Sequence, residues 1–178
     1  MSAAPDLGAV FDEHVACEFV EKDVDATMRT MTAEPYVWHV PVLTGAAGGE
    51  AVRRFYSSEF IGHTPEDATL HPISRTVSED RVIDEFVLEF THDSEVPWML
   101  PGVPPTGRKV RIPTVVVMGF EDGKVAHEHI YWDQASVLVQ LCLLDPSRHP
   151  VAGGEQADPS WSVRAAGAPG RLEPRRAV

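Results

Sequence analysis

Four residues that can donate or accept protons alternate along one apolar segment of the chain: His127, His129, Tyr131 and Asp133. Side chains of a β-strand alternate between its two faces, so these four share one face. The opposite face carries Ala126, Glu128, Ile130 and Trp132. A carboxyl group in a largely apolar cavity has its charged form disfavoured and can exchange protons with carbon or oxygen acids. The pattern indicates acid–base chemistry, with Asp133 carrying the proton and with His129 and Tyr131 relaying a proton or holding an oxyanion.

Each of these residues also has a purely structural interpretation. Asp133 stands directly before the segment 134–144, which is expected to be a short helix. A carboxylate at a helix N-cap accepts backbone N–H bonds, which would depress its pKa. His129 and Tyr131 are equally ordinary as hydrogen-bonded core residues. Catalysis and capping are compatible if one oxygen of Asp133 faces the pocket.

Three further polar residues lie on or beside expected strands. His39 lies on the segment 36–42, and His92 stands at the start of a long loop. Both are candidate catalytic histidines, and His92 would either orient a substrate carbonyl or simply face water. Arg75 would neutralise an enolate or a carboxylate, although an arginine on a strand more often pairs with an acid such as Glu85.

The loop 92–107 is apolar and stiffened by prolines. Loops of this length in compact domains are often lids over a binding site. Trp98 and Met99 would then contact an apolar ligand; alternatively, they cover the sheet or a partner subunit. Tyr56, on the helical segment 50–61, is a further candidate for contact with the substrate.

Several other kinds of site are disfavoured. A zinc site needs three or four converging ligands, and the candidate set is His127 and His129 with one further histidine, so we expect no metal. Serine-nucleophile chemistry lacks a Gly-x-Ser-x-Gly elbow. Cys17 and Cys142 lie in apolar helical patterns without metal-ligand spacing, which is typical of reduced, buried cysteines. We expect no cofactor.

Helical and strand-like periodicities follow one another along the chain. Apolar residues recur at helical spacing over 50–61 and over 7–31, where two consecutive helices or one kinked helix fit. Glycines between positions 45 and 49 indicate a turn. Besides the aromatic segment 36–42, period-two alternation predicts strands over 69–76, 81–91, 109–120 and 125–132. Helices followed by antiparallel strands and a final short helix predict an α+β fold.

Three motifs between positions 103 and 144 resemble those of one family: Pro104-Pro105-Thr106-Gly107, Asp122-Gly123-Lys124, and a strand ending in Asp133 before Leu138-Val139-Gln140-Leu141. They are similar to the motifs of SnoaL-like polyketide cyclases (ester cyclases), within the nuclear-transport-factor-2-like superfamily. The resemblance covers roughly residues 8–145. It implies a curved antiparallel sheet wrapped around the N-terminal helices, in a cone with an internal hydrophobic pocket.

The resemblance also implies roles for individual residues. The proposed acid–base residue of these cyclases, an aspartate at the end of the last strand, maps onto Asp133. His39 matches a histidine often found on the first strand, and the pair Thr91-His92 matches a Thr-His pair common in the family. One departure is Cys142, which stands where the family usually has a glycine that ends or loosens the helix.

Length and composition favour one domain, at residues 1–145, followed by a tail at 146–178. The chain has 178 residues, of which 43% are hydrophobic, enough for one full-sized core. The tail is rich in proline, glycine and alanine, and we expect it to be flexible unless Trp161 docks onto the domain. No apolar run approaches the ~18 residues of a membrane helix, so we expect a cytoplasmic protein without a membrane partner.

Charge and the last strand bear on partners. A formal net charge of −12 disfavours binding to a phosphate backbone, so nucleic acid is not an expected partner. The strand face with Ile130 and Trp132 is too apolar to be left in water beside Val115 and Val117. We therefore expect a homodimer formed through this face, taken as the outer face of the sheet.

Together these features predict a cofactor-independent acid–base enzyme that acts on a small, largely apolar carbonyl compound. The reactions in view are an aldol-type cyclisation, an isomerisation, a dehydration, or lactone or ester chemistry. The alternative is a non-catalytic module of the same fold that binds a small ligand or dimerises. The two differ in whether a carboxyl group points into a closed pocket beside a second polar group.

Overall fold

A computed structural model describes residues 5–158, which form helices packed on one curved sheet. The sheet contains six strands in the order β2-β1-β6-β5-β4-β3. Their bounds are β1 Met31–His39, β2 Thr44–Ala47, β3 Thr69–Val77, β4 Arg81–Thr91, β5 Lys109–Glu121 and β6 Lys124–Trp132. The pairing of β1 with β6 is parallel and the other pairings are antiparallel. The predicted α+β class with a curved sheet is confirmed, except that the sheet is mixed.

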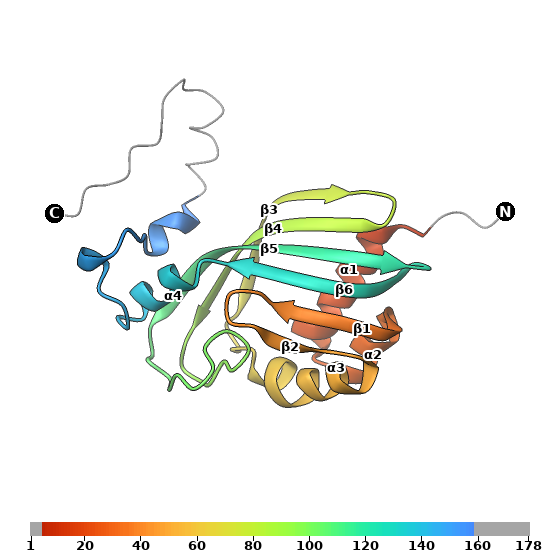
Figure 1. The fold of residues 1–178 in the computed structure, drawn as a ribbon, viewed down its shortest axis with the longest axis horizontal. Helices are drawn as coiled ribbons and strands as arrows, with labels where there is room; N and C mark the ends of the chain where they lie inside the picture. Colours follow the sequence, from red (N-terminus) through yellow and green to blue (C-terminus); the bar gives the residue numbers. More distant parts are fainter. Residues whose placement is uncertain (1–4, 159–178) are drawn as a thin grey trace, which may run out of the picture.

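The α-helices are α1 Leu7–Ala16, α2 Val24–Thr30, α3 Gly49–Phe55 and α4 Gln134–Gln140. Figure 1 shows α1 behind the sheet and α3 along its β1–β2 edge. Two helical segments widen into π-helix, Cys17–Glu21 after α1 and Tyr56–Phe60 after α3. The N-terminal region is thus two consecutive helices joined by a π turn, the first of the two arrangements that fit its periodicity. No helix in residues 5–158 is long and apolar enough to cross a membrane.

The segment expected to be only a glycine turn contains the edge strand β2. Gly45 has φ of +127°, and a Cβ on it would lie 2.0 Å from the backbone oxygen of Val37 on β1. Glycine is therefore required for β2 to approach β1. Strand β1 also begins earlier than expected and runs through Pro35. Small residues have low β-propensity, so tertiary pairing rather than composition makes this edge a strand.

The alternation along β6 is confirmed, but the assignment of its two faces was wrong. Glu128, Ile130 and Trp132 are buried on the side that faces α1, whereas Tyr131 is 42% exposed on the other side. The apolar face of β6 is therefore covered by the chain's own core. It is not available as the dimer surface for which it was taken.

The packed structure continues beyond residue 145, where the tail was expected to begin. Short 3₁₀ helices form at Pro146–Arg148 and Gly154–Ala157, beyond the end of the sheet near α4 (Figure 1). Ser136 Oγ on α4 donates a hydrogen bond of 2.9 Å to the backbone oxygen of Gly153, and Ala157 is buried. Residues 146–158 thus pack on the domain; Trp161 lies outside the described residues.

Candidate functional site

An apolar cavity of about 220 Å³ lies between the inner face of the sheet and the N-terminal helices. Its walls come from α1, the two π segments, strands β1 and β3 to β6, and the loop that carries Trp98 and Met99. Most wall residues are aliphatic or aromatic. The acids and bases among them are Asp12, Glu18, His39, Arg75, Asp84 and Glu128, with the hydroxyl of Tyr56.

A buried cluster of His14, Glu18, Tyr56 and Glu128 forms one end of this cavity. His14 Nε2 lies 3.0 Å from Glu128 Oε1 and 3.2 Å from Glu18 Oε1. The Tyr56 hydroxyl donates a hydrogen bond of 2.8 Å to Glu128 Oε1. All four side chains are at least nine-tenths buried. Both π segments supply a member, Glu18 and Tyr56, in keeping with the frequent occurrence of π turns at functional sites.

The orientation of His14 is fixed by a threonine. Thr30 Oγ1 donates to the backbone oxygen of Thr27, so its oxygen accepts from His14 Nδ1 at 2.5 Å. His14 Nδ1 is therefore protonated, and Nε2 points at the two carboxyl groups. An Nε2 lone pair facing two carboxylates would be repelled, so Nε2 also carries a proton and the ring is an imidazolium.

The pKa shifts in the cluster agree with this protonation. Burial alone would lower the pKa of His14, but the charges and hydrogen bonds of Glu18 and Glu128 raise it to about 10. Burial raises the pKa of Glu18. Burial opposes ionisation of Glu128 too, yet His14 and the Tyr56 hydroxyl more than offset it and lower its pKa. Glu128 is thus the stable carboxylate, and Glu18 is the carboxyl group that protonates more readily.

The two oxygens of Glu128 differ. Oε1 accepts hydrogen bonds from both His14 and Tyr56, whereas Oε2 has no hydrogen-bond partner within residues 5–158. A carboxylate that is anchored by one oxygen and lines an apolar cavity is arranged to act on a ligand with the other. Burial raises the pKa of Tyr56 well above its ordinary value, so Tyr56 remains a donor to Glu128.

His39 stands apart from the cluster, in an aromatic part of the cavity wall. Its ring lies 5.2 Å from that of Trp98 and 5.8 Å from that of Trp132, measured between centroids. Phe55 and Phe60 complete the surroundings. Burial lowers the pKa of His39 to about 4, so the imidazole is neutral near pH 7.

Arg75 lies in the cavity wall but is already paired. Its Nε donates to Asp84 Oδ1 at 2.7 Å and its Nη1 donates to Asp12 Oδ1 at 2.8 Å. Its guanidinium also stacks 4.6 Å from the centroid of Phe11. The expected partner Glu85 instead accepts a hydrogen bond from Ser74. Arg75 therefore links α1 to β3 and β4, surrounded by more negative than positive charge.

Asp133 does not line the cavity. It caps α4, where its Oδ1 accepts from the backbone N–H groups of Ala135 and Ser136, at 2.9 and 3.3 Å. Its Oδ2 accepts a hydrogen bond of 2.7 Å from Gln156. Both oxygens are thus occupied in a structural role, and the structure does not bring Asp133 together with the other acid–base groups.

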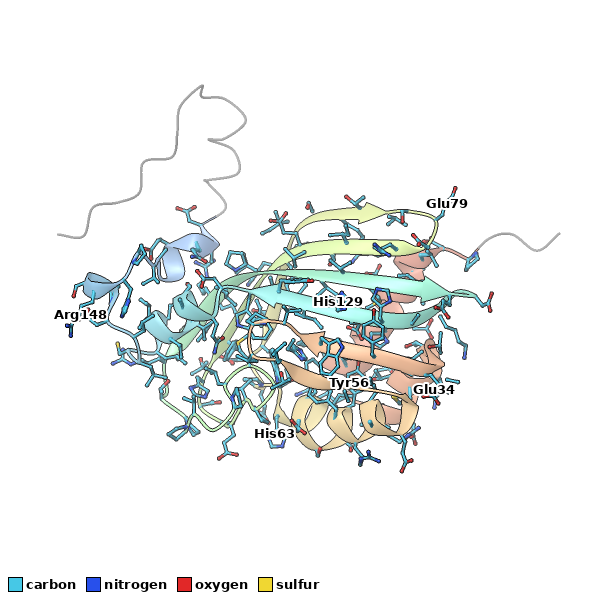
Figure 2. The ribbon with its side chains drawn as sticks, viewed as in Figure 1. Glu34, Tyr56, His63, Glu79, His129 and Arg148 are labelled. Atoms are coloured by element: carbon cyan, nitrogen blue, oxygen red, sulfur yellow. The ribbon has the colours of Figure 1, made fainter. Side chains whose placement is uncertain are left out.

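Of the remaining expected site residues, some line the cavity, two lie on the outer face of the sheet, and His92 is buried outside the cavity. His39, Tyr56, Trp98, Met99 and Arg75 line the cavity. His129 projects from β6 on the side of the sheet turned away from α1 (Figure 2). Tyr131, on the same face of β6, borders a shallow hollow with His129 and Trp38. His92 is buried at the base of the loop. Its Nδ1 lies 3.2 Å from Thr106 Oγ1, and its backbone oxygen accepts from Thr106 and Gly107.

Sequence reasoning missed His14 and Glu18 and treated Glu128 as part of an outward face. The available signal was the burial pattern of α1, since His14 and Glu18 are spaced i,i+4 on the same stripe as Phe11 and Val15. A histidine and an acid on an apolar stripe, with an acid between Val125 and Ile130, indicate a buried polar network.

The same cluster is where a metal ion would fit. Ligand atoms of His14, Glu18 and Glu128 all lie within 4.8 Å of one another, and no other such group occurs in residues 5–158. Histidine and carboxylates suit several divalent cations. A cation there would have to displace the Nε2 proton of His14, because that proton already bridges the two carboxyl groups.

Comparison with known proteins supports the fold. The family model described as SnoaL-like domain matches residues 11–128. A candidate SnoaL-like polyketide cyclase from Jannaschia sp. CCS1 superimposes with a TM-score of 0.61 at 23% identity, over 82% of this chain and 98% of that one. AclR, a candidate hydroxylase from Streptomyces galilaeus, gives a TM-score of 0.60 at 22% identity, over 80% and 100%. No curated protein shows a significant sequence match.

A third similar structure is SalBIII, described as an epoxide hydrolase/cyclase-like enzyme in pyran ring formation of the polyether salinomycin. It gives a TM-score of 0.54 at 19% identity, over 71% of this chain and 89% of that one. At these identities the structural likeness establishes the fold and not the reaction.

Proposed function

Because the chain belongs to the SnoaL-like domain family, whose model spans residues 11–128, we propose that it is an acid–base enzyme acting on a small, largely apolar carbonyl compound. The observation that carries the proposal is the Glu128 carboxylate in an apolar cavity, with Oε1 anchored by His14 and Tyr56 and Oε2 without a partner. Fold relatives named for cyclase and hydroxylase activities are consistent with an enzyme.

The first step is proton transfer from carbon to Glu128. Oε2 removes a proton from the carbon next to the substrate carbonyl, and the electron pair of the C–H bond moves to the carbonyl oxygen as an enolate. Tyr56 and His14 hold Glu128 in place throughout, since they bind only its other oxygen. Glu18, when protonated, is the acid that can return a proton from the same end of the cavity.

Several outcomes share this first step. Return of the proton to another carbon is an isomerisation, attack of the enolate carbon on a second carbonyl is an aldol-type cyclisation, and loss of a β-hydroxyl is a dehydration. None of the three requires a group beyond the cluster and the substrate.

Exchange of protons next to a ketone tests the proposal without knowledge of the natural substrate. We expect the protein to speed deuterium incorporation into small ketones such as acetophenone in D₂O, followed by proton NMR. Glu128→Gln should reduce the enzyme-dependent rate by ~10²-fold or more, since positioned general bases contribute on that scale. Glu128→Asp is the matched variant, because it keeps the negative charge beside His14 but shortens the reach into the cavity.

Undiminished exchange in a folded Glu128→Gln protein would remove Glu128 from the mechanism. The alternative, a non-catalytic module, is favoured if ketones bind in the cavity and exchange no faster than in buffer.

A further inference from the structure

Two residues that line the cavity each have a buried side-chain nitrogen without a hydrogen-bond partner: His39 Nδ1 and Trp98 Nε1. Both residues are almost fully buried, with 2% and 3% of their surface exposed. They come from distant parts of the chain, strand β1 and the loop after β4, and their rings lie 5.2 Å apart. Burying such a group without a partner costs ~1–3 kcal/mol, so two of them in neighbouring rings need an explanation.

Trp132 provides an internal comparison. It lines the same cavity, and its indole Nε1 donates a hydrogen bond of 2.6 Å to Gln134 Oε1. The fold therefore supplies a partner for one cavity tryptophan and not for the other. The third buried side-chain nitrogen without a partner in residues 5–158, His92 Nε2, belongs to a side chain outside the cavity wall.

The loop that carries Trp98 is held in place. Thr44 Oγ1 donates a hydrogen bond of 2.5 Å to the backbone oxygen of Trp98, and Gln134 Nε2 donates one of 3.1 Å to that of Met99. The ring of His39 is enclosed by Phe55 and Phe60. Both unpartnered atoms are therefore on rigid supports, as a binding site requires.

The charge of the cavity limits what can occupy it. Its wall carries four acidic residues, Asp12, Asp84, Glu18 and Glu128. Arg75, also in the wall, is already bonded to Asp84 and Asp12. His39 is neutral, as shown above. A ligand carboxylate or phosphate would meet net negative charge in a medium of low dielectric constant, so anions are disfavoured.

The size of the cavity limits the ligand further. An engineered protein cavity of ~150 Å³ holds one benzene molecule. A cavity of about 220 Å³ therefore accommodates a single ring with a short substituent rather than several fused rings.

We propose that Trp98 Nε1 and His39 hold the carbonyl oxygen of an uncharged, single-ring ketone. This rests on the proposed function and assigns its oxygen site. When Glu128 takes the proton from carbon, the electron pair moves to the carbonyl oxygen. The indole N–H and the neutral imidazole N–H donate to that oxygen and stabilise the enolate. Reprotonation at carbon returns the electron pair and restores the ketone.

Three ligands of matched size test the inference: acetophenone, ethylbenzene, which lacks the oxygen, and benzoate, which adds a charge. Spectra of the protein labelled with ¹⁵N in its tryptophan indoles report each N–H separately. The four tryptophans are assigned by replacing Trp38, Trp132 and Trp161 one at a time with phenylalanine. The comparison of ligands is then made on the unaltered protein.

We expect acetophenone to shift the Trp98 indole signal downfield and to leave that of Trp132 nearly unchanged, because Trp132 is already bonded to Gln134. Ethylbenzene should not shift Trp98 in this way, and benzoate should not bind. Trp98→Phe should weaken acetophenone about 5- to 10-fold, as expected for one hydrogen bond, without weakening ethylbenzene. His39→Phe should behave alike.

Equal affinity for acetophenone and ethylbenzene, with an unmoved Trp98 signal, would overturn the inference. Binding and exchange are separate readouts. If acetophenone binds through Trp98 but its protons do not exchange, the oxygen site stands and the proposed function fails. If exchange depends on Glu128 while Trp98 and His39 prove irrelevant to binding, the function stands and the oxygen site fails.

Discussion

His14 on α1 and Glu128 on β6 form a buried pair, with 3.0 Å between Nε2 and Oε1. The pair joins the first helix to the last strand across the inner face of the sheet. Removing one member of such a pair leaves an uncompensated buried charge, which is strongly destabilising. The pair therefore contributes to stability as well as to the geometry of Glu128.

Stability should fall on the alkaline side of neutrality. An unfolded histidine has a pKa of about 6.5, whereas the pKa of folded His14 is about 10. The folded state thus keeps a proton that the unfolded state releases. The stabilisation is complete below pH about 6.5 and is lost as the pH rises through about 10. Urea unfolding between about pH 7 and pH 9 measures it, and His14→Gln should flatten the profile. An equally steep decline in that variant would assign the effect to other groups.

The two glutamates should respond differently to neutralisation. Burial raises the pKa of Glu18, whereas His14 and Tyr56 lower that of Glu128. Glu18→Gln replaces a carboxyl group that resists ionisation, so it should leave the melting temperature near pH 7 unchanged or higher. Glu128→Gln removes the stable carboxylate beside His14 and leaves the His14 charge facing only Glu18, whose burial opposes ionisation, so it should lower the melting temperature. Calorimetry on both variants checks the order, and the reverse order would contradict the protonation assigned here.

Asp133 should behave as a capping residue. Asp133→Ala removes the N-cap of α4 and the bond from Gln156, so unfolding should become easier by ~1–2 kcal/mol. Proton exchange into ketones should persist. Gln156→Ala is the matched control, since it leaves both N-cap bonds of Asp133 in place. Loss of exchange in a folded Asp133→Asn protein, in which the cap is preserved, would instead return Asp133 to the mechanism.

How far the sequence predicts this molecule depends on the range of the interaction concerned. The strands 81–91 and 125–132 follow from local alternation and appear within a residue of their predicted ends. Strand β2 does not, because Gly45 and its neighbours form a strand only through pairing with β1.

The site shows the same division. Trp98, Met99 and Tyr56 were placed near a ligand from their residue types and segments, and His39 from the family resemblance; all four line the cavity. Which face of β6 turns toward the cavity could not be predicted in this way. Rules that place charges outward fail for Glu128, whose burial depends on His14, a residue far away in the sequence. The packing on the outward face of β6 also depends on residues that are distant in the sequence. His127 stacks on Tyr36 and lies over Gly119, where a Cβ would meet the His127 ring.

Cys142 offers a test of backbone strain. Helix α4 ends in a Schellman motif, in which Cys142 N–H bonds the backbone oxygen of Val139 and Leu143 N–H bonds that of Leu138. Cys142 has φ of +59°, a left-handed conformation that costs an L-residue ~1–2 kcal/mol. Cys142→Gly should raise the free energy of unfolding by about 1 kcal/mol. Cys142→Ala removes the thiol but keeps the strain and should give no such gain; equal gains would point to the thiol.

The outer face of the sheet is where we expect a second copy to bind. The homodimer was first assigned to the face with Trp132, which is buried; the apolar residues that do face outward include Trp38, Val40, Leu43 and Tyr131. Leu43 is 77% and Tyr131 42% exposed, and they border one hollow, as an interface core would. A two-fold axis would place this surface against itself.

Light scattering should give twice the 19.5 kDa of one chain. Tyr131→Glu should shift the protein toward the monomer, whereas Val20→Glu, at an exposed position on the π segment after α1, should not. A monomer of unaltered sequence at micromolar concentration would refute the prediction, and a dimer untouched by Tyr131→Glu would place the contact on another surface.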